Sequence, residues 1–268
     1  MTTATIDRGG LLLRYEDVGE GPAVLFQHGL GGDLAQVAEV FPAAPPVRRL
    51  TLECRAQGGS QAGPPAAFAI ATFADDVAFL ADRLGIGRAV VGGISMGAAI
   101  ALRLAVIRPD RVGALVLGRP AWLFAPAPDN MRPIAHVAEL LRTQDPASAR
   151  AAFERSETAR RLARDAPDNL VSLRGFFERS DPATMAALLG AIAADGPGVS
   201  EADVRAIAVP TLVIGTADDA IHPLAFAERI AATIPNAKLA EVTSKSKDRA
   251  RYVAEFRDAL ATFLARLA

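Results

Sequence analysis

Residues 89–105 read AVVGGISMGAAIALRLA, and this stretch decides how the rest of the chain is interpreted. Ala89-Val90-Val91 is a short apolar run with two β-branched residues, which is typical of a buried parallel strand. From Ala98 onward the residues are rich in alanine and leucine and have high helix propensity. Between the two, Gly93-Ile94-Ser95-Met96-Gly97 fits the pattern G-x-S-x-G. The sequence therefore predicts a strand, a tight turn and a helix, with Ser95 in the turn.

A serine at such a turn has the context of a nucleophile elbow. Side chains at positions 93 and 97 would collide with the neighbouring strand and helix, so the chemistry needs glycine at both. The turn lifts the Ser95 hydroxyl clear of the sheet, and the new helix points its N-terminal N–H groups at the same place. A developing oxyanion would be stabilised there.

Composition limits the classes of protein that the chain can belong to. It has 268 residues, of which 51% are hydrophobic and 22% charged, so it is long enough for a sizeable α/β core and is not disordered. The net charge of −1 and the absence of a basic run argue against nucleic acid and anionic lipid as partners. The single cysteine, Cys54, fits a reducing compartment, and the N-terminus lacks the apolar core of a signal peptide. No apolar run is long enough to span a membrane, so we expect a cytoplasmic protein without a membrane partner.

Strand and helix patterns alternate along most of the chain. Strands are expected at 11–15, 23–26, 49–53, 89–91, 112–117, 209–215 and 238–242, and helices at 73–84, 98–105, 223–234 and 250–267. The alternation stops at residues 121–200, which contain no convincing strand and several proline-punctuated helices. The simplest interpretation is an α/β core formed by residues 1–118 and 201–268, with a helical cap, residues 119–200, inserted into it.

Together these features resemble the α/β-hydrolase family, over nearly the whole chain. The matching features are His28-Gly29 after a strand, the turn Arg55 to Ser60, the elbow at 93–97, an aspartate after Gly215, the helical insertion, and the closing strand and helix. The resemblance implies a mostly parallel central sheet flanked by helices. The family is catalytically diverse, so the fold does not identify the substrate.

The resemblance also implies roles for individual residues. Ser95 is similar to the family's nucleophile, and the N–H groups of Leu30 and Met96 occupy the positions of its oxyanion hole. The acid is Asp218 or Asp219. We favour Asp219 because of its four-residue spacing to Pro223, which we expect in the first turn of the next helix. His28 occurs in a turn where such a residue usually supports the loop, although geometry decides between that role and catalysis.

The general base is the point at which the sequence departs from the family. The family's histidine lies between the last strand and the last helix, here near Ser246 or Lys247, and residues 243–252 contain no histidine. His222, three residues after Asp219, is a candidate displaced base or simply a residue at the start of a helix.

Other residues are candidates for the site or its surroundings. His136 lies in the inserted helices, either on their surface or facing the pocket, and Trp122 either forms a pocket wall or packs in the interior. Lys245 or Lys247 would act as a serine–lysine base only if it were desolvated. No metal-ligand spacing, phosphate-binding loop or dinucleotide motif is present, so we expect neither a metal nor a cofactor. The oligomeric state is left open.

The sequence thus predicts a serine hydrolase that cleaves a small or medium carboxylic ester, thioester or lactone through an acyl-enzyme on Ser95. The inserted helices would shape an apolar site for the acyl group of this small-molecule substrate. The alternative is a non-hydrolytic or ligand-binding member of the same fold that holds an apolar ligand. The missing histidine motivates that alternative, because a serine hydroxyl at its free pKa is a poor nucleophile.

Overall fold

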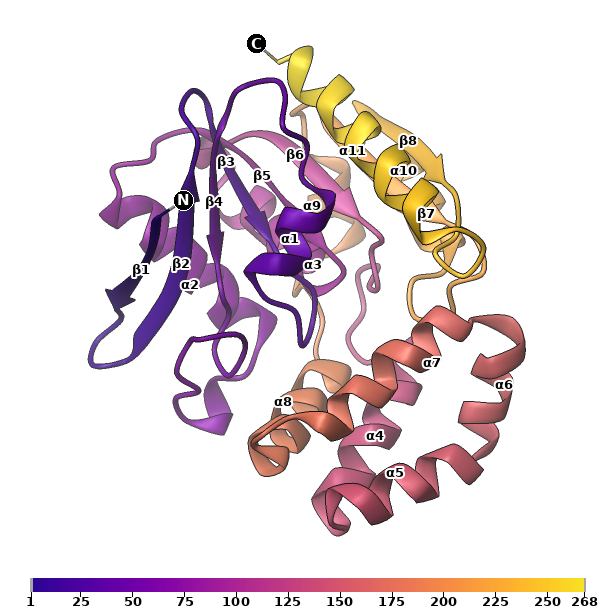
Figure 1. Cartoon of the computed structure of the whole chain (residues 1–268). Helices are drawn as coiled ribbons and strands as arrows, with labels where there is room; N and C mark the ends of the chain where they lie inside the picture. Colours follow the sequence, from indigo (N-terminus) through magenta and orange to yellow (C-terminus); the bar gives the residue numbers. More distant parts are fainter. Residues whose placement is uncertain (1, 268) are drawn as a thin grey trace.

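One eight-stranded sheet forms the centre of the part of the chain that the computed structural model describes, residues 2–267. The strand order is β1-β2-β4-β3-β5-β6-β7-β8 (Figure 1). β1 and β2 run antiparallel to their neighbours, and the remaining strands pair in parallel. The strands are β1 (Thr2–Asp7), β2 (Leu12–Val18), β3 (Ala23–Gln27), β4 (Arg48–Leu52), β5 (Ala89–Ile94), β6 (Val112–Gly118), β7 (Thr211–Thr216) and β8 (Ala237–Val242).

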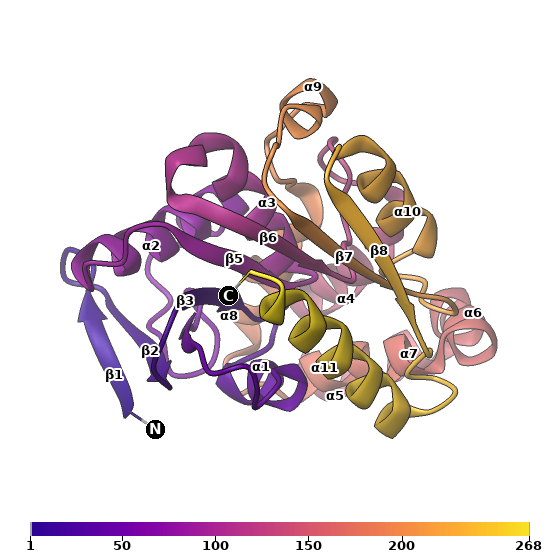
Figure 2. The same ribbon diagram turned by 90° about the horizontal axis from the view of Figure 1, so that it is seen from above.

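Helices cover both faces of the sheet. α1 and α11 lie on one face, and α2, α3 and α10 lie on the other (Figure 2). The bounds of the helices around the sheet are α1 (Leu34–Val40), α2 (Ile70–Arg83), α3 (Met96–Ile107), α9 (Glu201–Arg205), α10 (Leu224–Thr233) and α11 (Arg249–Ala265).

The side chains of β3 show how one strand serves both layers. Val24 and Phe26 pack with α1 and α11, whereas Leu25 packs into the cluster on the α2 and α3 face. Successive side chains of a strand point to opposite faces, so a continuous apolar run is what a strand covered on both faces requires.

Between β6 and β7 the chain forms a group of helices beyond one end of the sheet (Figure 1). These are α4 (Arg132–Thr143), α5 (Pro146–Arg155), α6 (Glu157–Asp165), α7 (Pro167–Arg174) and α8 (Pro182–Ala194), with short 3₁₀ turns at Asp129–Met131 (η3) and Gly175–Glu178 (η4). Val137, Leu162 and Leu188 are fully buried here and belong to the same apolar cluster as α2 and α3. This cluster holds the helical group against the sheet end at which β5, β6 and β7 finish.

The expected α/β-hydrolase architecture, a mostly parallel sheet flanked by helices, is confirmed, with differences at the N-terminal side. β1 and α1 were not predicted, and β2 extends three residues beyond its expected end at Tyr15. The extension contains Glu16 and Asp17, and acidic residues have low strand propensity. In the fold Glu16 pairs with Arg49 and Asp17 with Arg48 on the antiparallel neighbour β4, so cross-strand ion pairs stabilise the added residues.

Candidate active site

Ser95 occupies the tight turn between β5 and α3. Its backbone has φ +56° and ψ −113°, a conformation that L-residues rarely adopt. The Ser95 N–H donates to the carbonyl of Gly118 at 2.8 Å, and the Ser95 carbonyl accepts from Ala98 at 3.0 Å. These bonds to β6 and α3 hold the unfavourable conformation, as expected where strain is part of a functional site.

The two glycines of the motif are required by close backbone approaches. A Cβ at Gly93 would lie 2.5 Å from the carbonyl carbon of Gly97, and a Cβ at Gly97 would lie 2.3 Å from the carbonyl oxygen of Gln27. A Cβ at Gly29 would lie 3.3 Å from the Cβ of Ser95, so the loop after β3 passes directly beside the serine. The turn, the start of α3 and this loop therefore converge on one point.

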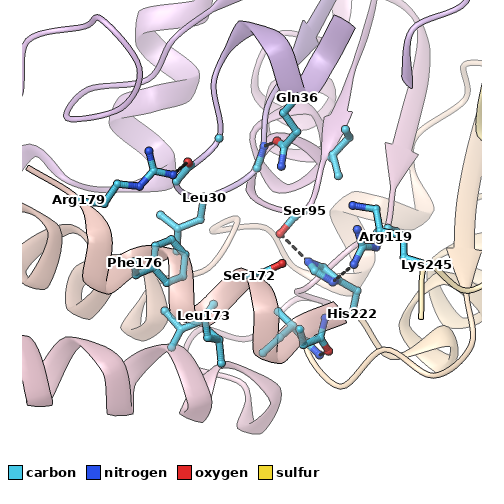
Figure 3. A pocket seen from close by; sticks show the side chains of 17 residues that line it. Leu30, Gln36, Ser95, Arg119, Ser172, Leu173, Phe176, Arg179, His222 and Lys245 are labelled. Atoms are coloured by element: carbon cyan, nitrogen blue, oxygen red, sulfur yellow. Dashed lines mark hydrogen bonds between the residues drawn. The ribbon is translucent and has the colours of Figure 1, made fainter. Parts of the chain in front are cut away.

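His222 lies against the serine hydroxyl. Its Nε2 atom is 2.8 Å from Ser95 Oγ, and its Nδ1 atom is 2.9 Å from Asp219 Oδ1 (Figure 3). The histidine precedes α10, and the aspartate lies in the same turn after β7. The structure thus brings together Ser95, His222 and Asp219, which the sequence analysis named as candidates. The aspartate and the histidine both belong to the turn between β7 and α10.

Arg119 is a further member of this group that the sequence did not reveal. It follows β6 directly, its N–H donates to the carbonyl of Ile214 in β7 at 2.7 Å, and its Nε donates to Asp219 Oδ2 at 2.9 Å. Asp219 Oδ1 also accepts from the backbone N–H groups of Ile221 at 3.2 Å and His222 at 2.9 Å. The carboxylate is therefore fixed on both oxygens, with Oδ1 turned toward the imidazole.

The electrostatics of the group favour a neutral imidazole beside an ionised carboxylate. Burial opposes ionisation of Asp219, but the charge of Arg119 and the hydrogen bonds from Arg119 and His222 hold its pKa well below the usual range. Burial lowers the pKa of His222, Arg119 lowers it further, and Asp219 acts in the opposite direction. A neutral imidazole whose Nδ1 faces a carboxylate leaves Nε2 free to accept a proton from the serine.

Two asparagines from the inserted segment hold the turn that carries His222. Asn169 of α7 accepts through Oδ1 from the N–H groups of Ala220 at 2.7 Å and Ile221 at 3.2 Å. Asn130 of η3 donates to the carbonyl of Ile221 at 2.6 Å. The position of the imidazole thus depends on residues far away in the sequence.

Two of the possible site residues lie outside the group. Asp218, the alternative acid, has φ +53° and its carboxylate accepts from Lys247 Nζ at 2.8 Å, so it does not face His222. His28 is fully buried, accepts through Nε2 from the Cys54 N–H at 3.0 Å and contacts the Gly29 carbonyl through Nδ1 at 2.7 Å. Its contacts are those of a residue that supports the loop.

The other two candidates pack within the protein. His136 lies edge-on to Phe153 with ring centroids 5.9 Å apart. Trp122 is buried, and its Nε1 donates to the carbonyl of Asp195 at 2.8 Å. Neither is among the described residues that line the cavity beside Ser95, so the pocket-facing interpretation of both is wrong. The reason is that each ring has buried apolar neighbours within reach, Phe153 for His136 and the main apolar cluster for Trp122.

A cavity of about 240 Å³ opens beside the serine (Figure 3). Its lining contains Leu30, Leu173, Phe176 and Ile221, but polar and cationic side chains are as prominent: Gln36, Arg119, Asn169, Ser172, Arg179 and Lys245. The sequence predicted an apolar site, and the structure shows instead a cavity whose lining is partly apolar and partly polar. The inserted helices bury their apolar faces against one another and against the core, so α7 turns Asn169 and Ser172 toward the cavity.

Residues 2–267 lack two kinds of feature. Among these residues no group of three or more histidine, cysteine, aspartate or glutamate side chains is arranged to hold a metal ion. In the same range, no helix combines the length and the apolar character needed to cross a membrane.

Arg119 and Asn169 are residues at this site that sequence reasoning missed. Arg119 follows a strand that ends beside the elbow strand, so its place at the carboxyl edge of the sheet was a usable signal. No such signal marked Asn169, because nothing in the local sequence distinguishes it from an asparagine on a helix surface. Lys245 was considered only as a base.

The fold and this group of residues define a hydrolase of the α/β class, and comparison with known proteins agrees. A family model described as the alpha/beta hydrolase fold matches residues 22–246. The chain belongs to the α/β-hydrolase family.

Curated relatives and solved structures are similar along most of the chain. A protein of Variovorax paradoxus (strain S110) named "Putative carbamate hydrolase RutD" is 32% identical over 240 residues, covering 82% of this chain and 83% of the relative. The enol-lactonase of Burkholderia xenovorans LB400 has a TM-score of 0.71 at 26% identity and covers 98% of this chain and 99% of its own. A thermophilic esterase from Thermogutta terrifontis has a TM-score of 0.73 at 26% identity, and the match covers 100% of this chain and 99% of the esterase. The chain is thus a hydrolase that acts on a small molecule.

Proposed function

We propose that this protein is a serine hydrolase that forms an acyl-enzyme on Ser95, with His222 as general base and Asp219 as its partner. The observation that carries the proposal is the 2.8 Å contact between His222 Nε2 and Ser95 Oγ, continued by the 2.9 Å contact from Nδ1 to Asp219. A nucleophile, a base and a group that orients the base are the parts that activated serine chemistry requires.

The reaction follows from this geometry. Ser95 Oγ attacks the substrate carbonyl while its proton passes to His222 Nε2, and Asp219 stabilises the imidazolium that forms. The imidazolium then gives the proton to the leaving oxygen, nitrogen or sulfur. A water molecule deprotonated by His222 attacks the acyl-enzyme, releases the acid and restores the hydroxyl of Ser95.

We place the oxyanion hole at the N–H groups of Met96 and Leu30. Met96 is the first residue of α3, where backbone N–H groups have no partner within the helix. Leu30 lines the cavity in the loop that passes beside Ser95. Two such donors stabilise a tetrahedral oxyanion and are typically worth a factor of about 10²–10³ in kcat each.

The substrate we propose is a small carboxylic ester, thioester, lactone or carbamate. Each has a carbonyl joined to a heteroatom that can leave, and the names of the relatives refer to carbamate, enol-lactone and ester chemistry. The cavity of about 240 Å³ is below the usual range for drug-sized ligands, which favours a compact substrate. We assign residues 119–200 the role of a cap that closes this cavity, and the buried free thiol of Cys54 supports a reducing, cytoplasmic compartment.

The non-hydrolytic alternative rested on the empty histidine position between β8 and α11. The missing histidine does not argue against hydrolysis if the turn after β7 supplies the base instead. His222 reaches Ser95 from there, so the loop from 243 to 248 does not need to supply a base.

The test is intact-mass detection of a fluorophosphonate adduct, because this reagent labels only an activated serine. We expect one adduct on the wild type, none on Ser95→Ala, and slow labelling of His222→Ala. Hydrolysis of a panel of small esters should be lost in the same variants. A folded wild type that neither forms an adduct nor hydrolyses any ester would refute the proposal.

A further inference from the structure

The cavity beside Ser95 has a one-sided distribution of charge. Three cationic side chains, Arg119, Arg179 and Lys245, are among the described residues that line it, and no aspartate or glutamate is (Figure 3). The protein as a whole has a net charge of −1, so this is a local property of the cavity and not of the composition.

Arg119 and Arg179 are in environments that accommodate their charges, one through carboxylates and the other through exposure to water. Arg119 is bonded to Asp219, and its Nη2 is 3.8 Å from Asp168. Arg179 is an exposed side chain that donates to the carbonyl of Gly31 and so braces the loop beside Leu30. The charge of Arg119 is therefore balanced by protein carboxylates. Arg179 forms no ion pair among the described residues, but it is exposed and water can hydrate its charge.

Lys245 differs from both. It is half-buried in the cavity, and no carboxylate oxygen of the described residues lies within the 4.0 Å of an ion pair from its Nζ. Its Nζ lies 5.0 Å from the centroid of the Tyr252 ring, which is a cation–π contact. The acidic groups in its surroundings, Asp168 and Glu39, are directed to Arg119 and Arg249.

Lys247, two residues along the same loop, provides an internal contrast. It is 68% exposed and forms an ion pair with Asp218 at 2.8 Å. Burial lowers the pKa of Lys245, and the charge of Arg119 lowers it further, whereas the hydrogen bond to Asp218 raises the pKa of Lys247. A partly buried ammonium without a counter-ion is costly, and a carboxylate of a ligand would remove that cost.

We propose that Lys245 is the counter-ion for a carboxylate that the substrate carries apart from its scissile carbonyl. This inference rests on the proposed function. It narrows the substrate to a compact half-ester, half-thioester, lactone or carbamate that also bears a free carboxylate. The loop in which the family has its catalytic histidine then holds a specificity-determining residue.

The experiment compares isosteric anionic and neutral esters. The anionic set is monomethyl succinate, glutarate and adipate; the neutral set is the matching ω-amides, beginning with methyl succinamate. Release of methanol followed by NMR gives kcat/KM for each. We expect wild type to favour the anion by about tenfold or more at the best chain length, since bonds to charged groups are the stronger class.

Three variants separate the charge of Lys245 from its bulk. Lys245→Met should reduce the anion-to-amide ratio to near one. Lys245→Glu should reverse the preference toward methyl 4-aminobutanoate, a gain that unfolding cannot produce. Lys247→Met, the matched control on the same loop, should keep the wild-type ratio. Equal kcat/KM for anion and amide in wild type, or an equal loss on both in Lys245→Met, would overturn the inference.

A binding measurement keeps this inference separate from the proposed function. Calorimetric titration with succinate, glutarate and adipate should show binding to wild type that Lys245→Met weakens about tenfold and Lys247→Met does not. Lysine-dependent binding without an adduct on Ser95 would contradict the proposed chemistry and support the subsite. Ester hydrolysis and an adduct on Ser95, with no charge preference and no diacid binding, would support the proposed chemistry and contradict the carboxylate subsite.

Discussion

Replacement of His222 by alanine tests the assignment of the base directly. Among the described residues, His222 Nε2 is the one basic side-chain atom recorded within hydrogen-bond distance of Ser95 Oγ, at 2.8 Å. Without it, the hydroxyl keeps its free pKa, and the oxyanion donors and the binding contacts remain. We expect kcat/KM to fall about 10³- to 10⁴-fold, at the upper end of what general-base catalysis contributes. That loss corresponds to about 4–5.5 kcal/mol of transition-state stabilisation.

The structure also predicts that this variant stays folded. Asp219 would keep the Arg119 Nε at 2.9 Å and the backbone N–H groups of residues 221 and 222, so no unpaired buried charge is created. His222 is 10% exposed and borders the cavity, so water can fill the space that the imidazole leaves. We expect a loss of about 1–3 kcal/mol in the free energy of unfolding, which is the range for one hydrogen bond to a charged group.

The assay is steady-state hydrolysis of a small methyl ester, with thermal unfolding measured on the same samples. Added imidazole should restore part of the activity of His222→Ala, because the vacated space opens to the cavity. His136→Ala is the matched control, since that histidine packs on Phe153 and does not line the cavity. Its activity should stay within about twofold of wild type.

A folded His222→Ala protein that kept a tenth or more of the wild-type activity would refute the reasoning. The base would then lie elsewhere. A large loss in both histidine variants, accompanied by a large drop in thermal stability, would show instead that the effect is structural.

Three further predictions concern the rest of the site. Arg119→Gln removes a charge that adds to burial in lowering the pKa of His222, so that pKa should rise. Because the base must be neutral, the ascending limb of kcat/KM against pH should move to higher pH, and an unmoved limb would contradict the coupling. Asp219→Asn should reduce kcat/KM by about 10²- to 10⁴-fold while Asp218→Asn stays within about threefold, which separates the two candidate acids kinetically. Gly97→Ala would place a Cβ 2.3 Å from a β3 carbonyl oxygen and should destabilise the protein by about 1–3 kcal/mol in urea unfolding, whereas an unchanged midpoint would refute the close packing.

Much of the fold is readable from local patterns. The apolar runs at β3, β5, β6 and β7 are continuous because both faces of those strands are covered, and they were predicted within about two residues at most ends. β1 was missed because Thr2–Asp7 has a weak pattern and becomes a strand only by pairing with β2. α1 was missed because seven residues give little helical periodicity, and its start depends on the Asp33 side chain that caps it.

The sequence by itself determined the nucleophile elbow, because strand propensity, glycine at 93 and 97, and helix propensity are local properties that agree. Local spacing also put Asp219 and His222 in one turn. Only the tertiary structure decided that His222, and not a residue of the loop after β8, lies beside Ser95. That placement depends on Arg119 from the end of β6 and Asn169 from α7, which meet the turn only after the chain has folded. Contacts between segments 50 to 100 residues apart leave no local periodicity, so they are decided by packing.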